Sequence, residues 1–332
     1  MRRTVAAVLL LGLVAGCGGN APTEQGQGSG QWSFKDDRGK EVTAEKRPER
    51  VVAQVSAAGA LKDYGINVVG TFGPLKRADG STDPEAGSID PSKVTDITGP
   101  GYGEIDFEKF AALDADLVVA GYYPEVTGLW HLTAEFEEKV AKIAPTVGIG
   151  QSKIQLPDGI KRYKELAKSL GADVDSAAVK AEEDAFTKAA DRLKAIGKKM
   201  TAANQKIQVV AGDPKLFYVA VPGRNPDLDW YTKELGLPML TPDKPDTEGG
   251  GYFQSLSWEN AGTYKEHVIM WDARAAWLDP EKMKEGHPVF QGLPAVQANR
   301  FVAWNAVAPL SYASYSKIMN KLADDLDQAL AK

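Results

Sequence analysis

The chain has 332 residues, of which 43% are hydrophobic and 25% are charged, and its formal net charge is −6 at pH 7. This composition is typical of a packed globular protein and excludes an intrinsically disordered chain. An acidic chain is also a poor general binder of nucleic acid, so we expect no nucleic-acid partner.

The chain begins with the pattern of a secretory leader. Arg2 and Arg3 precede an apolar run, Val5 to Val14, that is too short to span a membrane as a helix. The run leads to Cys17, the single cysteine, in a sequence that resembles the lipobox of bacterial lipoproteins. That resemblance implies that residues 1–17 are a lipoprotein signal with a diacylglycerol-modified Cys17. The mature chain would then be lipid-anchored on the extracytoplasmic face of the cell membrane. The alternative is an ordinary leader with a chance cysteine.

Residues 18–31 are dominated by glycine, glutamine and other polar residues, which predicts a flexible linker. The remainder is long enough for two domains and contains no second long apolar segment. With one cysteine there is no disulfide framework.

Two stretches of the chain share one pattern, in which short apolar runs alternate with helical segments. The predicted strands of the first stretch are Val51–Ser56, Val68–Gly73, Asp116–Gly121 and Pro145–Gly150. Those of the second stretch are Ile207–Gly212, Phe217–Pro222, His267–Trp271 and Phe301–Trp304. Short continuous apolar runs predict buried, parallel strands in an α/β fold.

Two predicted helices lie between these stretches. The first has Asp158 as its N-cap and ends at Gly171, and the second starts near Asp175. In the second helix, apolar residues recur every seven positions at Val179, Phe186, Leu193 and Met200. We therefore expect an N-terminal lobe at 32–155, a helical backbone at 156–204 and a C-terminal lobe at 205–332. The alternative is one large sheet covered by an ordinary pair of helices.

The sequence contains no phosphate loop, dinucleotide fingerprint, nucleophile elbow or zinc-protease motif. The histidines, His131, His267 and His287, are scattered and form no ligand cluster with carboxylates. We therefore expect no catalytic residues, no bound metal and no cofactor.

Aromatic and cationic residues follow the predicted strands, and ligands of open α/β sheets bind beyond the carboxyl ends of strands. Aromatic rings offer flat apolar contact, and arginines offer fixed donors to oxygen atoms. The candidate ligand-binding residues are Lys76, Arg77, Tyr122, Tyr123, Trp130, Lys215, Arg224, Tyr252, Trp271, Arg274 and Trp304. Together they suit a bulky ligand that is both organic and rich in oxygen. The alternative is that the rings are plain core.

Several segments, in their order along the chain, resemble the class III substrate-binding lipoproteins of ABC importers, which carry ferric siderophores, haem or cobalamin. The segments are Arg47–Val52, Tyr64–Gly70, Ile105–Val118, Lys142–Val147, Leu256–Glu259 and His267–Ile269. The resemblance covers about residues 32–332. Ala115 stands where the family has proline, and His267 where aspartate is common.

The resemblance implies two lobes with mainly parallel sheets joined by a long rigid helix, and a shallow cleft between them. It implies that Glu108 and Glu259 dock on arginines of an ABC permease; the alternative for each is an ordinary solvated carboxylate. The expected ligand is a ferric siderophore, with hydroxamates preferred, carried by a monomer. Haem and cobalamin remain alternatives. A tethered siderophore-modifying hydrolase is the alternative from another class, but the sequence offers it no nucleophile and base.

Overall fold

The computed structural model describes residues 31–125 and 128–332. The predicted leader, Cys17 and nearly all of the predicted linker lie outside the described residues. The described part opens with an antiparallel hairpin of β1 (Trp32–Lys35) and β2 (Glu41–Ala44), which the sequence analysis did not predict.

The first lobe is built on a six-stranded sheet with the order β5-β4-β3-β6, extended by β8 and β7 beside β6. Its strands are β3 (Val51–Gln54), β4 (Gly70–Phe72), β5 (Thr95–Asp96), β6 (Leu117–Tyr123), β7 (Gly128–Leu129) and β8 (Thr146–Gly150). All pairings are parallel except that of β7 with the end of β6. The helical segments of this lobe are α1 (Val55–Asp63), η1 (Pro84–Ala86), α2 (Phe107–Ala112) and α3 (Ala134–Ala141).

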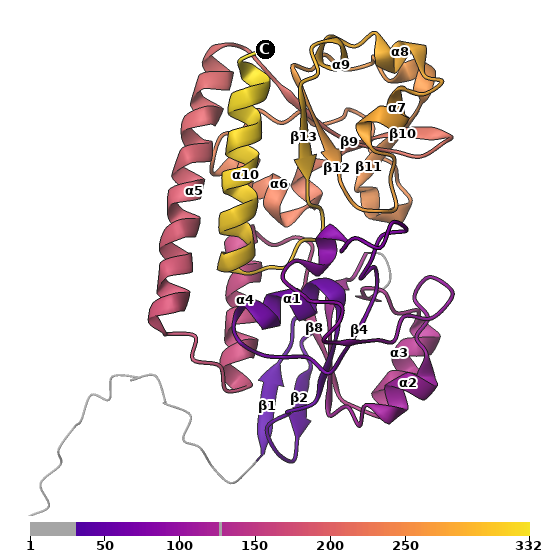
Figure 1. The fold of residues 1–332 in the computed structure, drawn as a ribbon, viewed down its shortest axis with the longest axis vertical. Helices are drawn as coiled ribbons and strands as arrows, with labels where there is room; N and C mark the ends of the chain where they lie inside the picture. Colours follow the sequence, from indigo (N-terminus) through magenta and orange to yellow (C-terminus); the bar gives the residue numbers. More distant parts are fainter. Residues whose placement is uncertain (1–30, 126–127) are drawn as a thin grey trace, which may run out of the picture.

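Two helices connect the lobes. The first, α4 (Leu156–Ser169), starts earlier than predicted: Gln155 is its N-cap, and Asp158 lies inside the first turn, where a negative charge favours the helix. The second, α5 (Ala177–Ala202), buries its seven-residue apolar repeat and is about 39 Å long. It packs along the C-terminal helix α10 (Tyr312–Leu330), and the pair runs beside the second lobe (Figure 1).

The second lobe is built on a five-stranded sheet with the order β11-β10-β9-β12-β13. Its strands are β9 (Ile207–Gly212), β10 (Leu216–Ala220), β11 (Phe253–Ser257), β12 (Val268–Asp272) and β13 (Phe301–Trp304). Its shorter helical segments are η2 (Pro222–Arg224), α6 (Pro226–Lys233), η3 (Gly249–Gly251), η4 (Trp258–Asn260), α7 (Pro280–Lys284), α8 (Pro288–Gln291) and α9 (Pro294–Gln297).

One strand of this sheet departs from the predicted parallel pattern. β10 runs antiparallel to both β9 and β11. The reason is the connection from Gly212 to Leu216, which is too short for the crossover that parallel neighbours require. β12 pairs in parallel with β9 and β13, so the sheet remains mainly parallel.

The two sheets lie one above the other in Figure 1, and the carboxyl end of β13 is directed toward the first lobe. Among the described residues, no helix has both the length and the apolar character needed to cross a membrane.

Candidate functional site

A hollow of about 200 Å³ lies between the lobes, and we call it the inter-lobe cleft. The first lobe contributes residues from the end of β6 and the turn after β7. The second lobe contributes the loops that follow β10, β12 and β13 and the loop before β11. The lining residues are Tyr123, Trp130, Asn225, Gly249, Tyr252, Phe253, Arg274, Trp277, Ala306 and Val307.

Aromatic rings from both lobes meet in the inter-lobe cleft. The ring centroids of Tyr123 and Trp130 are 4.7 Å apart, and Tyr252 of the second lobe lies 6.1 Å from Tyr123 in an edge-on arrangement. On the second lobe, Phe253 and Trp277 are 6.0 Å apart and both pack against Tyr218. The cleft therefore offers flat apolar surfaces from two sides.

Several polar atoms in this aromatic surface have no hydrogen-bond partner among the described residues. They are Nε1 of Trp130, Nε1 of Trp277 and the hydroxyl of Tyr252. Buried donors of this kind are normally satisfied. Nε1 of Trp130 lies near the carboxyl group of Glu85 and the hydroxyl of Tyr252 lies near Ser152, so a ligand would reach these atoms only after the side chains shift.

Arg274 is the one charged side chain among the described lining residues, and it is held by an ion pair. Its Nη2 lies 2.6 Å from Oδ2 of Asp272, and its Nε lies 3.0 Å from Oδ1 of the same carboxylate. Burial opposes the charge, but the pairing with Asp272 raises the pKa of Arg274 above its ordinary value. The guanidinium therefore stays charged and fixed.

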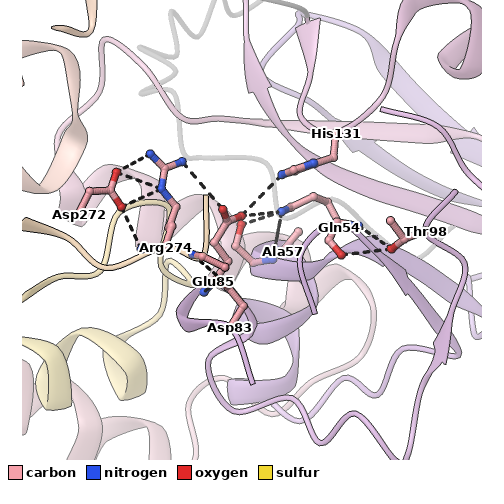
Figure 2. A network of polar contacts seen from close by, with 11 residues as sticks. Gln54, Ala57, Asp83, Glu85, Thr98, His131, Asp272 and Arg274 are labelled. Atoms are coloured by element: carbon pink, nitrogen blue, oxygen red, sulfur yellow. Dashed lines mark hydrogen bonds and ion pairs between the residues drawn. The ribbon is translucent and has the colours of Figure 1, made fainter. Parts of the chain in front are cut away.

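Behind Arg274 stands Glu85 of the first lobe, whose Oε1 is 3.9 Å from Nη1 of Arg274. Figure 2 shows Arg274 between Asp272 on one side and Glu85 on the other, with Gln54 and His131 approaching Glu85 from beyond. Gln54 donates to Glu85 at 3.3 Å, and Nε2 of His131 lies 3.8 Å away. Burial raises the pKa of Glu85 to about 8, against the opposing effect of Arg274. Burial and the charge of Arg274 lower the pKa of His131 to about 4.

Two further contacts join the lobes beside this network. The backbone N–H of Ala275 donates to Oδ2 of Asp83 at 3.1 Å, and Arg77 donates to the carbonyl of Ala273. The loop that carries Arg274 is therefore tied to the first lobe at several points.

The structure brings four of the predicted ligand-binding residues together as cleft lining: Tyr123, Trp130, Tyr252 and Arg274. Arg224 is exposed, and a side chain built at Gly251 would meet its Nη2 at 3.6 Å, which places it beside the loop that carries Tyr252. Arg77 lies at the lobe contact and not in the lining.

The other predicted residues do not line the inter-lobe cleft. Trp304 is 4% exposed and belongs to the core. Trp271 lies on the sheet face opposite to Asp272 and packs against a separate core cluster. Tyr122 and Tyr123 are consecutive residues of β6, and because side chains alternate along a strand, Tyr122 is directed to the opposite face of the sheet. Lys76 and Lys215 are exposed on loops.

The predicted ligand-binding residues leave out several residues of the site. Phe253 and Trp277 line the cleft next to predicted residues, and the aromatic character of both was a visible signal. Tyr102 is 60% exposed, and its ring lies 5.2 Å from His131 and 6.4 Å from Trp130. Glu85 carried no signal, because it lies in a segment without apolar periodicity.

Within residues 31–125 and 128–332, no group of three histidine, cysteine or carboxylate side chains is placed to hold a metal ion.

Residues 52–308 match the family described as periplasmic binding protein. The iron(3+)-hydroxamate-binding protein FhuD of Bacillus subtilis is 28% identical over 316 residues, which cover 85% of this chain and 86% of FhuD. DesE of Streptomyces coelicolor, a ferric-siderophore receptor protein, is 37% identical with a TM-score of 0.81, covering 89% of this chain and 98% of DesE.

The petrobactin-binding protein YclQ of Bacillus subtilis has a TM-score of 0.63 at 18% identity, over 90% of this chain and 99% of YclQ, which is a likeness of fold alone. These matches confirm the predicted fold and family. The chain belongs to the periplasmic binding protein family.

Proposed function

We propose that this protein captures a ferric siderophore, of the hydroxamate type by preference, and delivers it to an ABC permease outside the cytoplasmic membrane. The observation that carries the proposal is the inter-lobe cleft, with aromatic rings from both lobes and the fixed guanidinium of Arg274. The names of two relatives point the same way, since one binds iron(3+)-hydroxamate and the other is a ferric-siderophore receptor.

Family membership makes this chain a binding protein, as predicted, and not an enzyme. Its affinity then depends on contacts that are in place before the ligand arrives. The fixed Arg274 and the close pair of Tyr123 and Trp130 are contacts of this kind.

The hollow of about 200 Å³ is small for a bulky chelate, so we expect part of the ligand to remain exposed or the loop at Gly249–Gly251 to shift. All three glycines of that loop have positive φ.

Two exposed glutamates suit a docking role on the permease. Glu108 lies in the first turn of α2 in the first lobe, and Glu259 lies in η4 of the second lobe. Neither has an ion-pair partner among the described residues. A carboxylate on each lobe would let a permease with two arginine sites grip both lobes at once.

The membrane anchor is the acylated Cys17, with residues 18–31 as a linker that gives the binding domain its reach. The division into lobes at 32–155 and 205–332, joined by 156–204, belongs to the same proposal.

The direct test is a titration of the purified protein with ferric siderophores, haem and cobalamin, followed by tryptophan fluorescence. Trp130 and Trp277 line the cleft and make the signal sensitive to binding there. Saturable quenching by a ferric trihydroxamate is the expected result. Quenching by haem or cobalamin alone would mean that one of these is the ligand in place of a siderophore. Chemical conversion of a siderophore by the protein would favour the alternative that it is a hydrolase.

A further inference from the structure

The positive charge in the lining of the inter-lobe cleft is neutralised by a neighbouring carboxylate. Arg274 is the sole charged residue among the described residues that line it. Its counter-ion, Asp272, has a fully buried side chain and contacts Arg274 through both carboxylate oxygens. Because the pair is buried together, its field at the cleft is that of a dipole and not that of a free cation.

The surroundings add no net positive charge on the far side of Arg274. Glu85 approaches Nη1 of Arg274 at 3.9 Å, and Asp83 holds the backbone of Ala275 next to it. Arg77 is the other cation at this lobe contact, and it donates to a carbonyl oxygen there. Because the pKa of Glu85 is raised to about 8, its carboxyl group is mostly protonated at pH 7, and the two arginines are balanced by Asp272 and Asp83.

The charge of a ferric chelate depends on its donor groups. Three hydroxamates lose one proton each, so their ferric complex is neutral. Three catecholates lose two protons each, so their ferric complex carries three negative charges. A negative complex in this cleft would lose hydration without meeting a net positive charge in return.

We propose that Asp272 is a specificity-determining residue, which neutralises Arg274 and thereby makes the cleft select uncharged ferric chelates over anionic ones. Arg274 then acts as a fixed hydrogen-bond donor to carbonyl and hydroxamate oxygens. This inference rests on the proposed function, because it concerns the charge of the same ligand. Arg224 is an exposed cation beside the loop that carries Tyr252, where water and salt screen its charge, so the proposal concerns the buried part of the cleft around Arg274.

The test compares two ligands on three proteins. The ligands are a neutral ferric trihydroxamate and a ferric tris-catecholate, and the proteins are the parent, Asp272→Asn and Asp175→Asn. Asparagine at 272 keeps an oxygen that can accept from Arg274 but removes the negative charge. Asp175 is an exposed residue in the turn between α4 and α5, so its substitution changes net charge by the same amount away from the cleft.

The parent should bind the neutral chelate more tightly. In Asp272→Asn, the ratio of the two dissociation constants should move about tenfold in favour of the tris-catecholate, as expected for an uncovered charge close to the ligand. In Asp175→Asn the ratio should not move. An unchanged ratio in a folded Asp272→Asn protein, or a parent that binds both chelates equally, would overturn the inference.

If Asp272→Asn does not fold, a second variant tests whether negative charge around Arg274 sets the preference between the two chelates. Glu85→Gln keeps the shape of the side chain and removes a carboxyl group that faces Arg274 and is ionised only above about pH 8. At about pH 9, above the raised pKa of Glu85, this variant should favour the tris-catecholate more than the parent does. No difference there would overturn the inference. A parent that binds neither chelate would instead remove the proposed function.

Discussion

The indole Nε1 of Trp304 donates a hydrogen bond of 2.8 Å to Oδ2 of Asp227, and both side chains are buried in the core of the second lobe. Burial raises the pKa of Asp227 to about 6, although the bond from Trp304 lowers it. The contact explains why an aromatic residue at a strand end is part of the core: its polar atom is already satisfied inside the protein.

Trp304→Phe should therefore lower stability without weakening ligand binding. The change leaves a buried carboxyl group without its donor, which costs about 1–3 kcal/mol. The loss should be larger at about pH 8 than at about pH 5, because the missing bond stabilised the ionised form. Urea unfolding at both pH values measures it, and a weakened siderophore affinity with unchanged stability would contradict the assignment.

The α/β class and the mainly parallel sheets followed from the order of apolar runs, and the family followed from the resemblance of several segments to known lipoproteins. The structure and the comparisons confirm them. Local pattern could not show the orientation of β10, which depends on a short connection. It also missed β11, whose half-buried edge position mixes polar and apolar residues, and the short β1–β2 hairpin.

The site was less predictable than the fold. Strand ends indicated the right edge, which is why Tyr123, Trp130 and Arg274 were found. The sequence pattern did not show to which face of the sheet a strand residue points, and Trp271 was therefore predicted to line the same site as Arg274. The polar network around Glu85 depends on contacts between distant segments, and no spacing along the chain records such contacts.

A matched pair of tryptophan variants can distinguish a residue that lines the inter-lobe cleft from one that packs in the core. Trp130→Ala should weaken ferric trihydroxamate binding about tenfold, because it removes a ring and a donor from the cleft. Trp271→Ala should leave binding intact but lower the free energy of unfolding by about 2 kcal/mol, because the ring packs in a separate core cluster. Calorimetric titration measures the siderophore affinity, and urea unfolding measures the free energy of unfolding. Weaker binding in Trp271→Ala with unchanged binding in Trp130→Ala would show that the ligand binds beside Trp271 and not in the inter-lobe cleft.

Glu85 gives the protein a predictable dependence of stability on pH. Its folded pKa of about 8 lies above the ordinary value, so the folded state keeps a proton that the unfolded chain releases. This contribution to stability is complete in acid and is lost as the pH rises toward the folded pKa. Glu85→Gln cannot ionise, so its stability relative to the parent should increase from about pH 5 to about pH 9. A constant difference between the two proteins would show that Glu85 is ionised throughout.

The docking proposal predicts a separation of binding from uptake. Glu108→Lys combined with Glu259→Lys should leave siderophore affinity unchanged, because both side chains are exposed and neither lines the inter-lobe cleft. Iron uptake should fall severely in cells that depend on the variant, because each new lysine repels the arginines expected on the permease. Glu45 and Glu234 are also exposed, and their joint change to lysine is the control for net charge. Equal uptake by the two double variants would mean that the permease recognises another surface, whereas a loss in the docking variant alone would identify the two glutamates as its contact points.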